Sequence, residues 1–521
     1  RAAGRDRGGG GGDEGGGPPP FDPQSLPTGS ELKAEKETRH FWEYQEQLLK
    51  RPLRPLDDQH WELQERELFA ADRVTQGSNF GHYDEIAVEC RGGQGDEVPI
   101  DSFEQACEAL ELPAGLAANL ERCAYGAATP VQKHCVPAAC SGTDVMVSAQ
   151  TGSGKTLAFL VPIIATALRQ GERPVQAGPV RPTSVVVAPT RELCRQIAHE
   201  AQRLCFRTAV RVVAVYGGAE AVPQLRQLAR GCDIVICTPG RLEDYVQRGV
   251  VSLRQVQHFV LDEADSILSM GFGAQVRALI ASASGRRPDK RDEGHQVMMF
   301  SATFPKKVQE LAADFMRPDH LWIGVGQLSS TASSVEQRFE DVADMNLDEK
   351  YEVLLRLLEQ SKDPEGKTAR TIVFVNTKQI VDELSWKLAD EGIRATPIHG
   401  NLTQAQRDRA FGILTSGRSS VLVATDVAAR GLDLPGIDHV INFDLPRYNN
   451  DYVHRIGRTG RIGNRGLATS LVGQRERQLR RIVQSMRDAL AEDPSATPVP
   501  QWLDAKLERA YRRAALQWHP D

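Results

Sequence analysis

Short apolar runs separated by helical stretches fill the chain from about residue 98 onward. The runs are rich in β-branched side chains and are nearly continuously apolar, rather than alternately apolar and polar. Strands of this kind are typical of a parallel sheet that helices cover on both faces. The runs that predict strands are residues 145–147, 184–187, 210–215, 234–236, 259–261 and 297–300, and then 372–375, 421–424, 440–443 and 467–472.

A small polar segment separates these runs into two groups. Residues 326–334 read Gly-Gln-Leu-Ser-Ser-Thr-Ala-Ser-Ser, the composition of a flexible linker. We therefore predict an α/β fold with two domains in tandem, residues 98–325 and 335–473, each a parallel sheet with helices on both faces. Residues 1–97 are predicted to be a disordered Gly-rich tail and an N-terminal extension, and residues 474–521 a C-terminal extension. Within residues 31–69, charges interspersed with aromatic side chains leave a partner-binding helix open.

Polar motifs follow the predicted strands directly. In open parallel sheets, ligand sites lie at the carboxyl ends of the strands, so this placement favours a functional site at one sheet edge. The motifs occupy residues 189–192, 217–218, 238–241, 262–265, 301–303 and 425–426.

A Gly-rich segment after the first strand has the pattern of a phosphate-binding loop. Its backbone N–H groups can surround phosphate oxygens at a helix N-terminus. Lys155 would neutralise the β and γ phosphates, and Thr156 would ligate magnesium. Ala149 stands where the general pattern has Gly. The segment consists of Ala149, Gln150, Thr151, Gly152, Ser153, Gly154, Lys155 and Thr156.

An acidic tetrapeptide, residues 262–265, follows another apolar run. Asp262 would hold the magnesium ion, and Glu263 would polarise the attacking water as general base. Acidic residues also favour helix N-termini, so the tetrapeptide alone could be a solvated helix start. Together with Lys155 upstream, it predicts an ATPase.

A basic segment of the second domain offers cations for the transition state. Arg458 and Arg461 are three residues apart and can share one helical face. They suit bidentate contact with γ-phosphate oxygens, as arginine fingers do, although a basic face toward solvent is the alternative. If they act on the phosphate held by the first domain, catalysis requires the two domains to close.

Specificity for ATP requires contacts to the base. Gln132 carries an amide that can donate to and accept from adenine. Tyr125 can stack on the base, although an isolated Tyr is more often part of a core.

Composition restricts the possible modes of nucleic-acid, metal and membrane binding. The formal net charge of −6 argues against a globally basic coat, so nucleic-acid binding must use a local stripe. The nine cysteines are scattered without a CxxC pair, which argues against zinc. The sequence contains no apolar run long enough for a membrane span, and we expect no membrane association.

These motifs, in this order, resemble the DEAD-box RNA helicase family over about residues 98–473. Residues 79–89, 67–69, 455–464 and 499–503 resemble the Vasa and Belle subgroup. The resemblance implies two RecA-like domains with ATP and Mg²⁺ as cofactors. Three positions depart from the usual pattern: Ala127 replaces an Arg, Ala128 replaces a Pro, and Asn401 stands where Asp is common. The stretch from Phe103 to Tyr125 is also about four residues longer.

The resemblance also implies roles for individual residues. Tyr125 and Gln132 would read adenine with Phe103 upstream, and Asp433 would reach the ribose. Residues that couple hydrolysis to closure would be Asp265, Ser301, Thr303 and His454. Residues that bind RNA would be Pro189, Thr190, Arg191, Gly218, Thr238, Arg241, His399, Gly400, Gln404, Arg407 and Thr425, with Arg430 at the interdomain surface.

The expected function is an ATP-dependent RNA helicase that binds single-stranded RNA and opens short duplexes without sequence specificity, because its contacts suit phosphates and 2′-hydroxyls. An ATP-gated RNA clamp and a DNA-translocating ATPase remain alternatives, and a GTPase is disfavoured because no guanine-reading segment is present. We expect a cytoplasmic monomer, with the nucleus second, that meets translation or mRNP proteins through its tails.

Overall fold

The computed structural model describes most of the chain outside its ends and several loops. The Gly-rich tail and linker residues 327–334 lie outside the described part, and so do Thr151, Asp433 and Arg461. The described residues are 28–51, 57–69, 87–93, 95, 98–150, 152–283, 294–326, 335–362, 368–429, 436–460, 466–474, 478–492 and 496–508.

The first domain contains an eight-stranded sheet in the order β1-β8-β2-β7-β6-β3-β5-β4. Its strands run parallel, except that β1 pairs antiparallel with β8 at the edge. The strands are β1 (Val88–Arg91), β2 (Val145–Ala149), β3 (Ser184–Val187), β4 (Val212–Val215), β5 (Ile234–Cys237), β6 (His258–Leu261), β7 (Gln296–Ser301) and β8 (Leu321–Val325).

Helices cover both faces of this sheet. Side chains alternate across a strand, so Val145 and Val147 of β2 enter one core while Met146 enters the other. The first core is completed by α3 (Phe103–Ala109), α4 (Ala114–Arg122), α5 (Pro130–Cys140), α6 (Lys155–Arg169) and α7 (Arg191–Leu204). The second is completed by α8 (Ala221–Ala229), α9 (Pro239–Gln247), α10 (Ala264–Ser269), α11 (Gly273–Ser282) and α12 (Lys306–Phe315).

The second domain has a six-stranded, fully parallel sheet in the order β11-β12-β10-β13-β14-β9. The strands are β9 (Val335–Asp341), β10 (Thr371–Phe374), β11 (Ala395–Ile398), β12 (Val421–Ala424), β13 (His439–Asn442) and β14 (Gly466–Val472). One face packs against α13 (Leu347–Gln360) and α14 (Lys378–Asp390). The other packs against α15 (Gln404–Thr415), α16 (Asp426–Ala429), α17 (Asn449–Ile456) and α18 (Leu479–Glu492). The predicted fold class of two parallel α/β domains in tandem is confirmed.

Two helices precede the first domain and pack on it. The first, α1 (Gly29–Lys50), contacts α8, and the second, α2 (Asp58–Phe69), contacts α7. A capping box starts α1: the Thr28 hydroxyl accepts from the Glu31 N–H, and the Glu31 carboxylate accepts from the Thr28 N–H. The segment for which the sequence left a partner-binding helix open is therefore helical and docked on the first domain.

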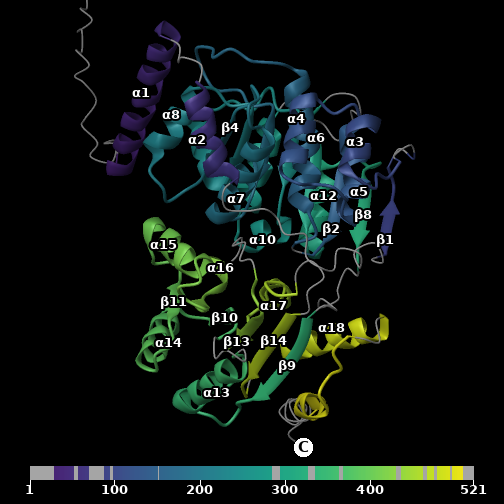
Figure 1. Cartoon of the computed structure of the whole chain (residues 1–521), viewed down its shortest axis with the longest axis vertical. Coiled ribbons are helices and arrows are strands. Elements are labelled where there is room, and N and C mark those ends of the chain that lie inside the picture. Colours follow the sequence, from purple (N-terminus) through teal and green to yellow (C-terminus); the bar gives the residue numbers. More distant parts are fainter. Residues whose placement is uncertain are drawn as a thin grey trace, which may run out of the picture.

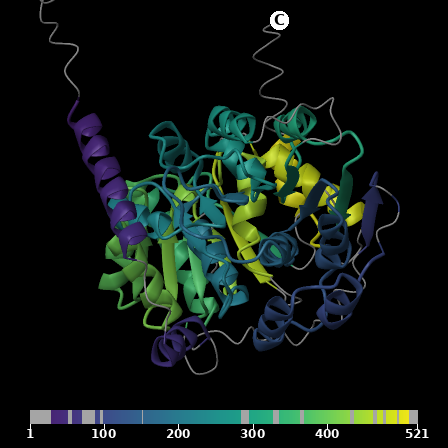
Figure 2. The ribbon, with the colours of Figure 1, turned by 90° about the horizontal axis from the view of Figure 1, so that it is seen from above.

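The two domains form separate lobes that meet at α10 and α17 (Figure 1). Seen from above, α1 lies along one side of the first lobe (Figure 2). None of the helices in the described part of the chain is both long enough and apolar enough to cross a membrane.

Candidate active site and nucleic-acid interface

The predicted phosphate loop connects β2 to α6. Gly152 and Gly154 have φ angles of 85° and 86°, a region that favours glycine. A Cβ on Gly154 would lie 2.4 Å from Gln132 Nε2, so glycine is also required there by space. Ala149 is the last residue of β2 and its side chain is buried in the core, so the strand accommodates this departure from the usual glycine without strain. Gln150 follows β2, and the Ser153 hydroxyl donates to its carbonyl.

Lys155 holds a buried positive charge at the centre of this loop. Its Nζ donates to the carbonyl oxygens of Ala149 at 2.6 Å and Gln150 at 3.2 Å, and the residue is only 8% exposed. Burial lowers the pKa of Lys155, against the opposing charges of Asp262 and Glu263. A buried ammonium group whose hydrogen bonds go to neutral carbonyls is suited to an incoming anion such as a phosphate.

The acidic tetrapeptide lies between β6 and α10. Burial raises the pKa of Asp262 to about 7, although Lys155 lowers it in part. Glu263 adopts a left-handed conformation with φ of 50°, and its buried Oε2 has no hydrogen-bond partner within the described residues. Lys155 offsets the charge of these two buried carboxyl groups only in part, so the site suits a further positive charge.

A magnesium ion would supply that charge. Mg²⁺ in nucleotide sites uses one or two protein oxygens together with phosphate oxygens and water, so a dedicated cage is not needed. In the part of the chain that is described, no group of three or more His, Cys, Asp or Glu side chains could hold a metal by itself. Thr156, in the first turn of α6, and Asp262 fit the role of the two protein ligands.

Asp265 connects this segment to β7 and to the second domain. Its Oδ2 accepts from the Thr303 hydroxyl at 2.6 Å, the Thr303 N–H at 3.1 Å and His454 Nε2 at 3.1 Å. The Ser301 hydroxyl donates to the Thr303 carbonyl and keeps that turn in place. The structure thus brings together all four predicted coupling residues.

The charges of Asp265 and His454 stabilise each other. Burial alone would raise the pKa of Asp265, but His454 and the Thr303 hydrogen bonds hold it well below its usual range. Burial would lower the pKa of His454, but the Asp265 carboxylate outweighs it and raises that pKa. The contact is therefore a buried ion pair between the two domains.

Arg458 lies on the same interface. It is 3% exposed, and its Nε donates to the His454 carbonyl oxygen at 3.2 Å. Its charge acts on Lys155 and lowers the pKa of that side chain further. The structure therefore places the predicted finger Arg458 close to the phosphate loop of the other domain, while Arg461, the second predicted finger, lies outside the described residues.

The segment predicted to read adenine packs directly on the phosphate loop. Gln132 closes a capping box on Thr129 and donates from Nε2 to the Gly154 carbonyl at 3.1 Å. The Thr129 hydroxyl donates to the Ser153 carbonyl at 2.8 Å. The hydrogen bonds from Gln132 to Gly154 and from Thr129 to Ser153 thus connect the proposed adenine contact to the phosphate loop.

The two aromatic residues of this segment differ in their surroundings. The Tyr125 ring is half-buried and its hydroxyl donates to Glu200, so the predicted base stacking must use the exposed part of the ring. Phe103 is 1% exposed and packs in the first core. The implied contact between Phe103 and adenine stays a prediction, and in this structure the ring packs in the core and does not face a nucleotide pocket. The predicted ribose contact, Asp433, lies outside the described residues.

A cavity of about 640 Å³ gathers most of the first domain's predicted RNA contacts. Gly218 lies beside it: its Cβ position would meet the Arg191 guanidinium at 2.1 Å, so glycine lets Arg191 lie flat against the backbone. The predicted RNA residues that line the cavity are Pro189, Thr190, Arg191, Thr238, Arg241 and Arg407. Thr and Arg side chains at strand ends can bind the sugar-phosphate backbone.

The predicted contacts of the second domain are not all in this cavity. His399 is buried and its Nε2 lies 3.0 Å from Asp382 Oδ1, which orients the ring within its own domain. Gly400 and Thr425 do not line the cavity either. The Gln404 side chain and Arg430 lie outside the described residues.

Arg407 also joins the two domains. Its Nη2 lies 3.1 Å from Glu192 Oε1, and Arg195 forms an ion pair with Asp408 beside it. The roles of Glu192, Arg195 and Asp408 could not be predicted from the sequence, because no local motif connects residues more than 200 positions apart.

Arg455 is a further residue that the sequence analysis did not assign. It is almost fully buried and donates to Asp426, Asn442 and Asn376 within the second domain. It therefore fixes the start of the segment that carries Arg458. The concentration of Arg and Gly in residues 455–461 was the sequence feature that could have indicated a role for Arg455.

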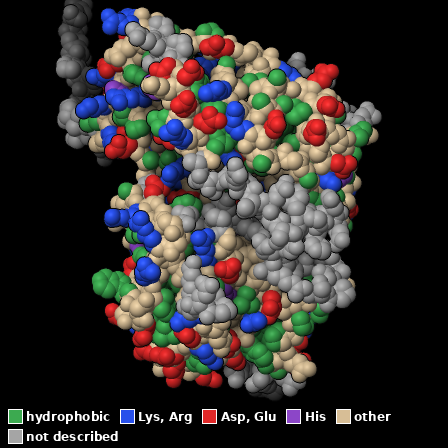
Figure 3. Space-filling model, in the orientation of Figure 1, with side chains coloured by type: hydrophobic (Ala, Val, Ile, Leu, Met, Phe, Trp, Pro, Cys, Tyr) green, Lys and Arg blue, Asp and Glu red, His purple; other side chains and the backbone are tan. Residues whose placement is uncertain are grey.

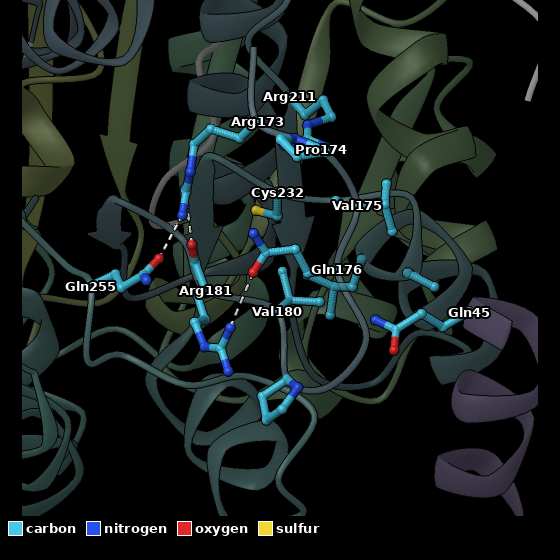
Figure 4. Close-up of a pocket in the computed structure, with 14 residues that line it drawn as sticks. Gln45, Arg173, Pro174, Val175, Gln176, Val180, Arg181, Arg211, Cys232 and Gln255 are labelled. Carbon is cyan, nitrogen blue, oxygen red and sulfur yellow. Dashed lines mark hydrogen bonds between the residues drawn. The ribbon is translucent and has the colours of Figure 1, made fainter. Parts of the chain in front are cut away.

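A smaller cavity of about 60 Å³ lies where β3, β4 and β5 begin (Figure 4). Its arginines are already engaged: Arg211 forms a bidentate pair with Asp233, Arg173 donates to the Arg181 carbonyl and Gln255, and Arg181 donates to Gln176. These contacts give the cavity a structural role at the sheet edge opposite the phosphate loop.

Comparison with known proteins agrees with this geometry. Residues 129–311 match the DEAD/DEAH box helicase family, and residues 349–463 match the helicase conserved C-terminal domain. The chain belongs to the DEAD-box RNA helicase family. Membership implies ATP binding, RNA binding and ATP-dependent RNA helicase activity.

Solved structures of DEAD-box proteins share the arrangement of both domains. Mss116p bound to ssRNA and AMP-PNP is 26% identical, with a TM-score of 0.65 over 77% of this chain and 79% of that one. S. cerevisiae Dbp5 bound to RNA and ADP BeF3 is also 26% identical, with a TM-score of 0.59 over 77% and 97%. A Dbp5 variant bound to a Gle1 variant and IP6 is 26% identical, with a TM-score of 0.56 over 80% and 99%. The predicted tandem RecA-like fold is thus confirmed.

Proposed function

We propose that this DEAD-box protein is an RNA-stimulated, magnesium-dependent ATPase that binds single-stranded RNA without sequence specificity and separates short RNA duplexes. The observation that carries the proposal is the contact of His454 with Asp265, which joins the second domain to the acidic tetrapeptide. A closed arrangement of this kind is needed when one domain holds ATP and the other completes its site.

Each residue at this junction has a chemical role in the proposal. Lys155 and Arg458 would stabilise the negative charge that develops on the transferred phosphoryl group. Glu263 would polarise the attacking water. A magnesium ion held by Thr156 and Asp262 would neutralise phosphate charge. Through its contact with His454, Asp265 would couple ATP binding and hydrolysis in the first domain to the position of the second domain.

RNA binding without sequence specificity follows from the type of contact. The lining Thr and Arg side chains, and the backbone around Gly217, suit phosphates and 2′-hydroxyls and do not read base edges. Closure of the two domains would bend the bound strand and displace its partner, and hydrolysis would release it.

The proposal also includes a cellular role and compartment. The resemblance of residues 67–69 and 499–503 to the Vasa and Belle subgroup supports a role in translation initiation or mRNP remodelling in the cytoplasm, with protein partners at the tails. The structure of Dbp5 with Gle1 gives one example of a DEAD-box protein with a protein partner.

The decisive experiment compares Glu263→Gln with Glu310→Gln, a control at an exposed position on α12. ATP turnover is measured with and without single-stranded RNA, and with DNA of the same sequence. We expect RNA alone to stimulate the wild-type and control proteins, and Glu263→Gln to lower kcat by about 10² to 10⁴ while ATP still binds. Normal turnover in Glu263→Gln would refute the assignment.

Strand displacement on a short RNA duplex separates the helicase from the clamp. A helicase releases the displaced strand at a rate that depends on ATP. A clamp holds RNA in the presence of AMP-PNP but releases no strand, and that result would replace the unwinding part of the proposal.

A further inference from the structure

The N-terminal helix α1 forms one wall of the 640 Å³ cavity. Ser30, Lys33, Ala34 and Glu37 line it opposite the predicted RNA contacts of the first domain. Helix α1 ends at Lys50, well before residue 129, where the family match begins. This wall is therefore an addition to the helicase core.

An arginine of the core holds α1 beside the cavity. Arg248, just after α9, donates from Nη2 to the Ala34 carbonyl at 2.6 Å and from Nε to the Thr38 hydroxyl at 2.9 Å. The same guanidinium pairs with Glu37 at 3.2 Å, and both side chains are mostly buried. Because α9 also carries the predicted RNA contact Arg241, α1 and that contact are parts of one rigid unit.

The rest of α1 is anchored along its length. Phe41 is completely buried in the second core of the first domain, and Leu48 is nearly so. Gln45 lines the small cavity (Figure 4) and exchanges two hydrogen bonds with the backbone of Gly178. Tyr44 accepts from Arg230. Helix α1 is thus anchored on the first domain from Ala34 to Leu48.

The charges at this wall favour a contact from Lys33. Arg248 is fully engaged with α1 and Asp244, which leaves little of its charge for a ligand. Lys33 is exposed, lines the cavity, and has no hydrogen bond or ion pair with any described residue. Further Lys and Arg side chains gather on the second lobe below the start of α1 (Figure 3). A strand of RNA that leaves the cavity on this side would meet a basic surface.

We propose that α1 extends the RNA-binding surface of the helicase core, and that Lys33 contacts a backbone phosphate of the bound single strand. The proposal rests on the RNA binding proposed above. Because Lys33 is held by a docked helix rather than by a tail, its contact costs little conformational entropy. The contact adds affinity but no sequence specificity.

The test measures the affinity of the full chain for single-stranded RNA with AMP-PNP at several salt concentrations. The variants are Lys33→Ala and, as a matched control, Lys50→Ala, which lies on the same helix about 25 Å away. We expect Lys33→Ala to bind RNA about 5-fold more weakly at low salt, because one exposed charge contact contributes about 1 kcal/mol. The slope of log K against log salt should fall by about 0.7, the value for one phosphate of a single strand.

Two further readouts identify a direct contact. Lys33→Ala should leave kcat at saturating RNA and the KM for ATP unchanged, because Lys33 is remote from the phosphate loop. Lys33→Glu should weaken RNA binding more than Lys33→Ala does. Lys50→Ala should match the wild type in every measurement.

Three results would overturn the inference. If Lys33→Ala keeps the wild-type affinity and salt slope, Lys33 makes no phosphate contact. If it binds RNA more tightly, α1 obstructs the cavity. If the wild-type protein fails to bind RNA at all, both this inference and the proposed function are refuted, whereas the first two results leave the proposed function intact.

Discussion

Asp265 Oδ2 lies 3.1 Å from His454 Nε2, and the same oxygen accepts from the Thr303 hydroxyl at 2.6 Å. One carboxylate oxygen thus receives hydrogen bonds from Thr303, which lies just after β7, and from His454 of the second domain. Any movement of the second domain away from the first must break this buried contact. The position of that domain and the geometry of the hydrolytic residues are therefore coupled at a single atom.

This ion pair predicts a dependence of domain closure on pH. The pKa of His454 is raised in the closed state, despite burial, because of Asp265, whose own pKa is depressed. A group with a raised pKa contributes stability that is complete below its ordinary value and is lost as the pH rises through the raised value. We expect RNA affinity with AMP-PNP to fall as the pH rises above about 6.5.

The matched variants for this experiment are His454→Gln and His60→Gln. His60 is exposed on α2, and its substitution should leave RNA binding unchanged. His454→Gln should weaken RNA binding at low pH and flatten the profile. If the wild type and His454→Gln show parallel profiles, the pair does not control closure.

Arg458 should act on catalysis more than on ATP binding. Removal of an arginine finger typically lowers kcat by about 10³ or more, because the charge of the transition state loses its partner. We expect this loss for Arg458→Ala, with a small change in the KM for ATP. Arg458→Lys should restore little, since an ammonium group cannot make a bidentate contact. Arg487→Ala, at an exposed position on α18, serves as the control and should keep the wild-type kcat.

Gly154 offers a test of the link between the phosphate loop and Gln132. Gly154 and Gly142 have nearly equal φ angles, 86° and 88°, but only a Cβ on Gly154 would meet Gln132, whereas nothing lies within 4 Å at Gly142. Gly142→Ala should cost about 1 kcal/mol of unfolding free energy from backbone strain alone. Gly154→Ala should cost more and should also weaken ATP binding. Thermal unfolding and ATP titration measure both effects, and equal losses for the two variants would show that the contact with Gln132 is unimportant.

Glu192 and Arg407 should stabilise the closed state as a pair. A double-mutant cycle with Glu192→Gln and Arg407→Gln isolates their interaction, which spans the domains at 3.1 Å. We expect a coupling of about 0.5 to 3 kcal/mol on closure, measured by fluorescence transfer between the domains with RNA and AMP-PNP bound. Glu336 and Arg338, an exposed pair within β9, should show no coupling on closure. Additive effects at Glu192 and Arg407 would mean that Arg407 acts on RNA alone.

Most strands of both sheets could be predicted from sequence, but the edge strands β1, β9 and β11, and β8 beside β1, could not. A central parallel strand such as β10 is buried along its whole length because helices cover both of its faces. The edge strand β9 alternates buried and exposed side chains, and β11 contains Pro397, which is tolerated only at an edge. Neither has the continuous apolar run that identified the others.

The parts of the candidate site that consist of residues adjacent in sequence could be predicted. The phosphate loop and the acidic tetrapeptide each carry their own pattern of residue types. Contacts such as Arg195 with Asp408, 213 positions apart, depend on how the two domains meet and leave no local signal. Burial likewise decided the place of Phe103, since sequence alone does not distinguish an aromatic side chain in a core from one beside a ligand.

The strands on either side of the interdomain linker are both fixed in their sheets. β8 is paired with β1 and β2 up to Val325, and β9 is paired with β14 from Val335. Ten residues of fully extended chain span about 35 Å, so Val325 and Val335 cannot be separated by more than about this distance. The linker therefore keeps each domain at an effective concentration of about millimolar relative to the other. Weak contacts suffice for repeated opening and re-docking, as a cycling motor requires.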